Sequence, residues 1–443
     1  MNTDIDSAIR FFIYVLIFWL PYSPAVVETC VVFCIVLWTF KRYFMFKNAK
    51  ESKCMNIIKD RLICFVRKFQ PVPSPINIPV ALFLFFCIVS IFRSNYFIQS
   101  FHGFFTKICE WFIVYFLIIE AFGNNIFLYS TKYKNNSRAL LKAKRQVYIA
   151  IGIFVFTSLA TAIDALLQFL VLHKDIFFGR GLAFGNRATA GFKTPNGLGA
   201  YLAVAIPITM SLVVLKGKRA RYRILNIATL IIMICALYLT FSRGAWLGIL
   251  VGILVLSLLF TYSMKKAVVS WGVLLSGLFF LVFLGINNPN FINNRRNTIQ
   301  WRLGVWEDSL KMVKERPLFG RGINTFMREF EAYRRDKGCD PTYAHNSYLQ
   351  LLVETGIAGL LTFLYVLWSL FRSVIDKIKY KYCNNEEMKV ISIGLTAGLA
   401  AFLVHSFFDN HMYCLQLSVY FWVLAGFVVV SSNFLCINED KNK

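Results

Sequence analysis

The chain has 443 residues, of which 57% are hydrophobic and 45 are phenylalanine, and this composition excludes an ordinary soluble protein. Its net charge of +25 lies in short clusters between apolar stretches of about 17–25 residues, each long enough to cross a bilayer core. Basic clusters beside such stretches set membrane topology, so the charge does not indicate a nucleic-acid partner. The 11 cysteines form no C-x-x-C pair, which argues against a zinc site or a disulfide framework.

Twelve apolar segments predict an all-α polytopic membrane protein in which residues 1–443 form a single integral membrane domain. The expected spans are 9–22, 24–40, 77–93, 104–122, 147–171, 198–215, 224–241, 245–262, 267–286, 347–370, 390–408 and 413–431. A cytoplasmic N-terminus places most lysines and arginines of the short connections in the cytoplasm, as the positive-inside rule requires. Residues 287–346 then form one large, basic external loop.

Helical periodicity marks part of this loop. Apolar residues recur at helical spacing through Ile299, Leu303, Trp306, Leu310 and Val313, whereas charged residues fall largely elsewhere on the wheel. The pattern predicts an amphipathic helix on the outer membrane–water boundary. The alternative is a helix that covers the bundle.

Arginines stand out on the external side. Arg243 lies in a tight turn between two spans, where an ionisable group is costly and marks a candidate functional site. The alternative is an arginine that reaches lipid phosphate. Further external basic residues are Arg187, Lys193, Arg295, Arg296 and Arg302. Guanidinium groups converging on one face suit a phosphate or diphosphate, which at a membrane surface indicates a polyprenyl-diphosphate lipid.

The segment "AHNSYLQ" contains an S-x-x-Q capping box, Ser347 and Gln350, which predicts a helix starting near Ser347. His345 precedes this start, where the positive end of the helix dipole favours the neutral imidazole that a general base needs. Its alternative role is to supplement the helix cap. We expect Asn346 either to orient the imidazole or to cap the helix.

The sequence offers little support for nucleotide, metal or ion chemistry. It has no G-x-x-x-x-G-K-[ST] segment, which argues against a P-loop ATPase. The first external turn, residues 21–24, carries no carboxylates, so we expect neither an essential divalent metal nor another cofactor. Glu110, Glu120 and Asp164 within spans leave ion-coupled transport as a minority alternative.

These residues resemble the O-antigen ligase and polymerase superfamily of bacterial envelope glycan enzymes over residues 185–365. His345, Asn346, nine further residues, Gly356 and Gly359 match the ligases' histidine motif without a gap. "SRGAWLG" is similar to the family's Ser-Arg-Gly turn, "RATAGFKTPNGLGAYL" to its R…G…PN segment, and "WRLGVWEDSLKMVKERPLFGRGINTF" to its loop helix. For Gly356 and Gly359 we expect close helix packing.

The resemblance implies a GT-C-like membrane glycosyltransferase in the bacterial inner membrane, with its active site on the periplasmic face. Its donor is a glycan on undecaprenyl diphosphate. Arg187 and Arg243 bind the diphosphate, and Arg302 is a weaker candidate for holding donor or acceptor phosphates. His345 is the base of a metal-independent inverting transfer. The first choice is ligation to lipid A–core, and the runner-up is a repeat-unit polymerase. A transporter or lipid-glycan flippase is the alternative from another class.

Overall fold

The computed structural model describes residues 2–52, 69–123, 137–183, 186–215, 220–261, 296–335, 343–379 and 385–436. Within these ranges regular structure is helical, apart from two isolated β-bridges that join Lys174 to Gly181 and Ala183 to Arg187. The all-α class predicted from composition is confirmed.

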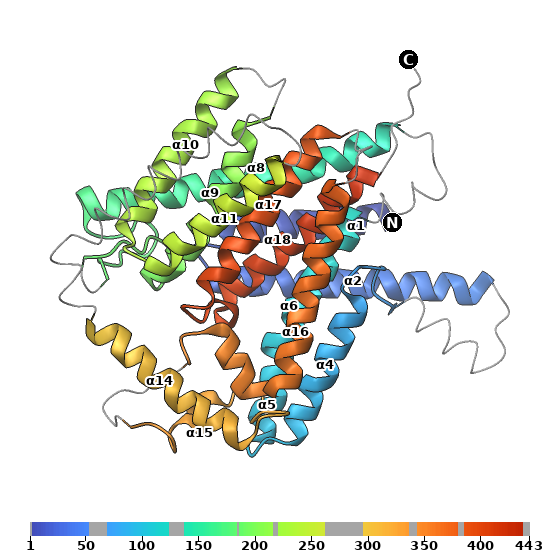
Figure 1. Cartoon of the computed structure of the whole chain (residues 1–443). Coiled ribbons are helices and arrows are strands. Elements are labelled where there is room, and N and C mark those ends of the chain that lie inside the picture. The colour runs from blue at the N-terminus through green and yellow to red at the C-terminus, as the bar shows by residue number, and fades with distance from the viewer. Residues whose placement is uncertain are drawn as a thin grey trace.

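The helices alternate with short connections along the chain (Figure 1). The first half contains α1 (Asn2–Trp19), α2 (Pro24–Ser52), α4 (Asn77–Phe92), α5 (Phe97–Gly103), α6 (Glu110–Ile118), α8 (Ser137–Leu167) and α9 (Pro195–Val213), with π-helical turns η1 (Phe104–Cys109), η2 (Ile119–Gly123) and η3 (Gln168–Leu172). The second half contains α10 (Ala220–Leu239), α11 (Arg243–Thr261), α14 (Arg296–Glu315), α15 (Phe326–Phe330), α16 (Ser347–Lys379), α17 (Glu386–His405) and α18 (Leu415–Asn433), with 3₁₀ turns η4 (His411–Tyr413) and η5 (Phe434–Cys436).

Eight helical segments among the described residues are long and apolar enough to cross a membrane, so the polytopic prediction is confirmed. Helix α4, with 16 residues, is a shorter apolar helix. Each predicted span within the described residues coincides with helical structure, whereas the predicted span 267–286 lies outside them. The count of twelve therefore stays a prediction.

Helices α9, α17 and α18 form the centre of the bundle, with 83%, 78% and 94% of their apolar windows buried inside the protein. Glycines allow their neighbours to approach closely. A Cβ atom at Gly398 would lie 2.9 Å from Val204, and one at Gly248 would lie 2.6 Å from the carbonyl oxygen of Ala401. Such packing through small residues is typical of membrane helices, and it fixes the loops at the helix ends.

Helix α16 is broken at Gly356, where φ is 71°. Four backbone hydrogen bonds of 2.8–3.2 Å join the break to the Pro-Leu-x-Gly-x-Gly turn: Arg321 N to Val353 O, Gly322 N to Glu354 O, Ile357 N to Pro317 O and Ala358 N to Leu318 O. A Cβ atom at Gly356 would meet the backbone of Leu318 at 2.4 Å. The expectation of close helix packing is wrong for Gly356, because this glycine forms one backbone joint with the turn.

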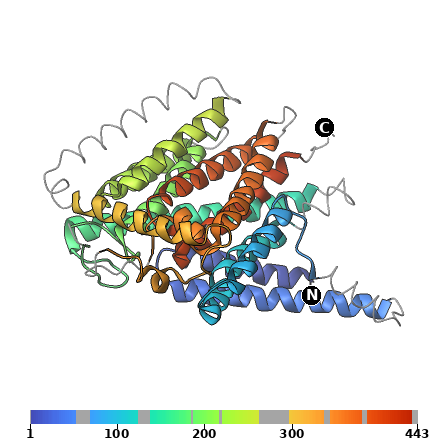
Figure 2. The same ribbon diagram turned by 60° about the horizontal axis from the view of Figure 1, so that its bottom comes forward.

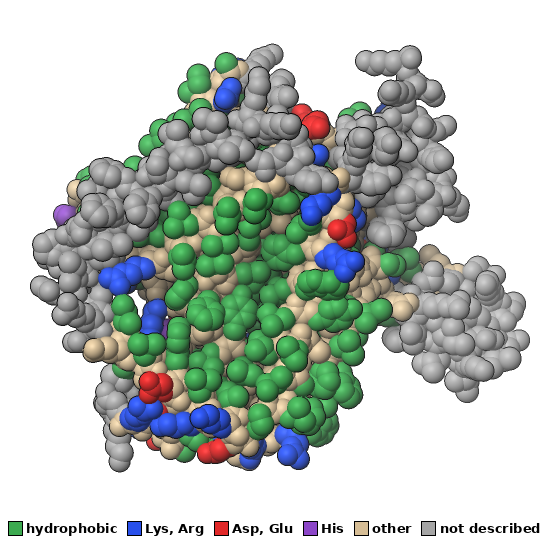
Figure 3. Space-filling model, in the orientation of Figure 1, with side chains coloured by type: hydrophobic (Ala, Val, Ile, Leu, Met, Phe, Trp, Pro, Cys, Tyr) green, Lys and Arg blue, Asp and Glu red, His purple; other side chains and the backbone are tan. Residues whose placement is uncertain are grey.

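The joint places α14 across one end of the bundle (Figure 2). Val305 and Met312 on one side of α14 are buried, whereas Ile299, Leu303 and Leu310 on another side are 47–49% exposed. These three residues of the predicted apolar stripe face outward, as a helix at a membrane boundary requires, whereas Trp306 and Val313 of the same stripe are partly buried and pack inward. Figure 3 shows hydrophobic side chains over the front of the bundle and lysine and arginine side chains along its lower edge, around α14 and α15.

Candidate active site

The start of α16 is capped by Asn346. Its side-chain Oδ1 accepts hydrogen bonds from the backbone N–H groups of Tyr348 and Leu349, both at 3.0 Å. The helix begins at Ser347, as predicted. Of the two roles expected for Asn346, helix capping is the one observed, and this side chain is 4% exposed.

The predicted capping box between Ser347 and Gln350 is wrong. Gln350 Oε1 instead accepts from the backbone N–H of Ala344 at 2.8 Å, and Ser347 Oγ donates to the backbone carbonyl of Asp409 at 3.0 Å. These bonds hold both ends of His345, whose φ of 50° is uncommon for a residue other than glycine. Backbone strain of this kind concentrates at functional sites.

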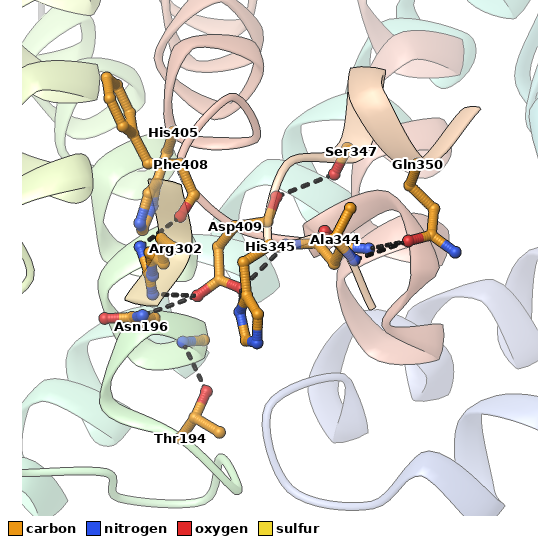
Figure 4. Close-up of polar contacts among 12 residues, drawn as sticks. Thr194, Asn196, Arg302, Ala344, His345, Ser347, Gln350, His405, Phe408 and Asp409 are labelled. Atoms are coloured by element: carbon orange, nitrogen blue, oxygen red, sulfur yellow. Dashed lines mark hydrogen bonds and ion pairs between the residues drawn. The ribbon is translucent and has the colours of Figure 1, made fainter. Parts of the chain in front are cut away.

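His345 is paired with Asp409. Its Nδ1 atom lies 3.2 Å from Asp409 Oδ1, although the two residues are 64 positions apart in the chain. Because a carboxylate only accepts hydrogen bonds, Nδ1 carries the proton and Nε2 keeps the lone pair. Figure 4 shows the Asp409 carboxylate between His345 and the side chains of Arg302 and Asn196. This is the base-and-orienter geometry of many catalytic histidines.

Sequence reasoning missed Asp409. The residue lies at the corner between α17 and α18, in "HSFFDNHMY". The signal was available, because an aspartate in a very short connection between two predicted spans is as unusual as Arg243 is in its own turn. What the sequence could not show is that this corner lies beside residue 345.

Asp409 is held by three side chains. Besides His345, Asn196 Nδ2 donates to Oδ2 at 2.6 Å, and Arg302 Nη2 lies 3.8 Å from the same oxygen. Burial alone would raise the pKa of the carboxyl group, but the hydrogen bond from His345 and the electrostatic interactions with His411, Arg302 and His345 hold that pKa well below its usual range. The carboxylate is therefore ionised at neutral pH and stabilises positive charge on the imidazole.

Arg187 reaches the same cluster through Asn196. Its Nη2 donates to Asn196 Oδ1 at 2.9 Å, and its Nε donates to the carbonyl of Thr240 at 2.8 Å. Burial, and then the positive charge of Arg302, lower the pKa of Arg187 to about 10, while Asp409 opposes this change. The guanidinium stays protonated at neutral pH.

Arg243 begins α11 and is exposed. The preceding residue, Ser242, places its Oγ 3.3 Å from Nε2 of buried His405, and a Cβ atom at Gly244 would lie 2.6 Å from the His405 ring. The turn that carries Arg243 is thus packed against the same corner that carries Asp409. The carbonyl of Thr240 in this turn accepts a hydrogen bond from Arg187. The same turn therefore carries Arg243 and binds Arg187.

The remaining predicted residues fall into two groups. Arg302, on α14, joins the cluster and also donates from Nη1 to the carbonyl of Phe408 at 2.6 Å. Lys193 is exposed in the loop before α9. Arg296 begins α14, where the structure describes its backbone and not its side chain. Arg295 lies outside the described residues. Their convergence with the other arginines stays a prediction.

The cations of this site are arginines. Among the described residues, no group of three or more His, Cys, Asp or Glu side chains could hold a metal ion. The Arg302 side chain is 25% exposed, so part of this guanidinium is open to another group. The arrangement can remove a proton from a hydroxyl through His345 Nε2 and can bind an anion through guanidinium groups.

The fold and the site together define a polytopic α-helical membrane protein with a His–Asp pair and arginines gathered at one end of its bundle. A family model described as "O-Antigen ligase" matches residues 228–364, which include Arg243, Arg302 and His345. The resemblance seen in the motifs is confirmed over these residues, where the chain is similar to the O-antigen ligases.

Two curated proteins are similar to this chain. A general O-oligosaccharyltransferase of Acinetobacter baylyi is 26% identical over 253 residues, which cover 53% of this chain and 44% of that protein. An uncharacterized protein of Haemophilus influenzae is 24% identical over 217 residues, which cover 43% of this chain and 52% of that protein. The chain thus spans about half the length of the curated relatives it matches.

Proposed function

We propose that this chain transfers a glycan from undecaprenyl diphosphate to an acceptor hydroxyl at the periplasmic face of the bacterial inner membrane, with lipid A–core as the acceptor. The observation that carries the proposal is the pairing of His345 Nδ1 with Asp409 at 3.2 Å, beside Arg302 and close to Arg187. A base next to several guanidinium groups suits a reaction between a hydroxyl and a lipid diphosphate. The match to the O-antigen ligase family supports the same reaction class.

His345 activates the acceptor in this mechanism. As the hydroxyl oxygen attacks the anomeric carbon, its proton moves to the lone pair of His345 Nε2. The resulting imidazolium lies against the ionised carboxylate of Asp409, which lowers the energy of the transition state. Asp409 also fixes the tautomer of the His345 imidazole, because its carboxylate accepts a hydrogen bond from the protonated Nδ1.

The arginines stabilise the leaving group. The bond between the anomeric carbon and the diphosphate oxygen breaks on the face opposite to attack, and its electron pair stays on the diphosphate, so the configuration inverts. Arg187, Arg243 and Arg302 neutralise the charge that develops there. The partial exposure of the Arg302 side chain supports this role. Since the lipid diphosphate is already activated, the mechanism requires neither a nucleotide nor a divalent metal.

A second acceptor class is favoured by one comparison. The similarity to a general O-oligosaccharyltransferase favours a hydroxyl on a protein as the acceptor, with the same donor and the same roles for His345 and the arginines. The repeat-unit polymerase is the remaining alternative within the family, and its acceptor is another lipid-linked repeat.

Deletion of the gene, followed by gel analysis of glycolipids and glycoproteins, separates these functions. Loss of polymer from lipid A with accumulation of lipid-linked polymer is the expected result. A single repeat on lipid A would indicate the polymerase, and glycan lost only from proteins would indicate the O-oligosaccharyltransferase. The deleted strain should be restored by the wild-type chain and not by a chain with His345→Gln. Unchanged glycolipids and glycoproteins would contradict the proposal.

A further inference from the structure

Asn196 lies between the two charged halves of the site. It occupies the first turn of α9, after Pro195, and its amide reaches Asp409 on one side (Figure 4). On the other side the amide reaches Arg187. Helix capping does not explain it, because Thr194 Oγ1 already caps α9 by accepting from Gly197 N at 3.1 Å. The Asn196 side chain is therefore directed at the site for another reason.

The chemistry of the two neighbours determines how the amide is oriented. A guanidinium only donates hydrogen bonds and a carboxylate only accepts them, so Oδ1 faces Arg187 at 2.9 Å and Nδ2 faces Asp409 at 2.6 Å. A carboxylate at this position would repel Asp409, and an ammonium would repel Arg187. Among side chains of this size, the amide satisfies both neighbours while keeping them apart.

We propose that Asn196 is a positioning residue that couples the diphosphate-binding Arg187 to the His345–Asp409 base and prevents Arg187 from pairing directly with Asp409. This inference rests on the proposed function. Asp409 already acts electrostatically on Arg187, and a direct ion pair would remove the guanidinium from the diphosphate and the carboxylate from His345. With the amide between them, Arg187 remains available to a substrate phosphate and Asp409 remains directed at the imidazole.

Removal of the amide should therefore change the chemistry more than donor binding. In Asn196→Ala, Asp409 turns toward Arg187 and Arg302, so the imidazolium of His345 loses part of its partner. We expect kcat to fall about 10–100-fold, as for other residues that orient a catalytic group, with the KM for the lipid donor changed much less. Besides His345, the charged or titratable groups that interact with Asp409 are Arg302 on α14, Arg187 in the loop before α9, His405 at the end of α17, His411 of η4 and Cys414 before α18. None of these groups is altered in Asn196→Ala. Because the imidazolium of His345 is less well stabilised there, the acid limb of the pH–rate profile should move to lower pH.

Asn196→Asp is a second variant that keeps the side-chain volume. The new carboxylate pairs with Arg187 and repels Asp409, so we expect a higher KM for the lipid donor as well as a lower kcat. Thr194→Ala is the matched control, because it removes the cap of the same helix without touching Arg187 or Asp409. It should lower the unfolding midpoint and leave the pH–rate profile unchanged.

The measurement is glycan transfer by the full chain in liposomes, with an undecaprenyl-diphosphate-linked glycan as donor and lipid A–core or a serine-containing protein as acceptor. An unchanged kcat and pH profile in Asn196→Ala would overturn the inference, and so would the same changes in Thr194→Ala. If Asn196→Ala does not fold, an unchanged donor KM in Asn196→Asp overturns it. The wild type and His345→Gln are measured alongside. Absence of transfer by the wild type would count against the proposed function, not against the role of Asn196.

Discussion

Two clusters of charged side chains lie at opposite ends of the helical bundle. The site cluster consists of Arg187, Arg302, His345 and Asp409, together with the uncharged Asn196. The closed cluster consists of Asp6, Arg10, Lys41, Arg42 and Glu120. The turn between α1 and α2 lies at the site end, because Gln416 Nε2 at the start of α18 donates to Leu20 O at 2.9 Å. The start of α1 and the second half of α2, which carry the closed cluster, are therefore at the other end.

The clusters differ in how their charges are used. In the closed cluster, Glu120 accepts from Lys41 at 2.9 Å and from Arg42 at 2.5 Å, and these side chains are only 4–9% exposed. In the site cluster, the side chains of Asp409, Arg302 and His345 are 17%, 25% and 31% exposed. Removing one partner from a buried ion cluster destabilises the fold, whereas a partly open cluster keeps groups available for a substrate. This difference separates the intramembrane Glu120 from the functional residues.

The largest effect should follow from His345→Gln in the site cluster. Glutamine keeps hydrogen-bonding capacity and approximate size but removes the base, so we expect kcat to fall about 10²–10⁴-fold. The measurement is glycan transfer in reconstituted membranes, and His102→Gln, an exposed position on α5, is the control. Wild-type turnover in His345→Gln would exclude the general-base role.

A smaller effect is expected from Arg243→Lys. Lysine keeps the charge but loses the planar fork that binds two phosphate oxygens at once. We expect kcat/KM for the lipid donor to fall about 10²-fold, as when one charge-stabilising donor is removed from an active site. Arg328→Lys, at an exposed position on α15, is the control and should retain wild-type kinetics. If both variants behave alike, Arg243 has only a topological role.

The smallest effect on activity is expected from Glu120→Gln in the closed cluster. The change removes the carboxylate that buried Lys41 and Arg42 share, although Lys41 keeps its ion pair with Asp6, so the free energy of unfolding should fall by about 3 kcal/mol. Transfer per folded molecule should remain at the wild-type value. Denaturation in detergent micelles measures the stability, with Glu28→Gln on the exposed face of α2 as control. A loss of kcat without a loss of stability would show that the closed cluster takes part in function.

Much of the fold could be predicted from local sequence. Apolar segment lengths predict the membrane helices, because a bilayer imposes a minimum span on any helix that crosses it. The periodicity around Leu303 and Leu310 predicts α14, and the outward position of both side chains agrees with the boundary helix expected there. Local signals failed at the start of α16, where Ser347 and Gln350 match a capping box but bond to Asp409 and Ala344 instead. Tertiary contacts compete for the same side chains, and here they prevail.

By itself the sequence determined the membrane class, the helix at Ser347, and His345, Arg187 and Arg243 as candidates, because each of these follows from short-range composition or spacing. Only the tertiary structure decided that Asp409 orients His345 and that Asn196 stands between Asp409 and Arg187. It also paired Gly356 with the turn at Gly320, where a Cβ atom would lie 2.5 Å from Glu354. The physical reason is the same in each case. A hydrogen bond or close backbone contact between residues far apart in the chain depends on helix packing, which no local pattern encodes.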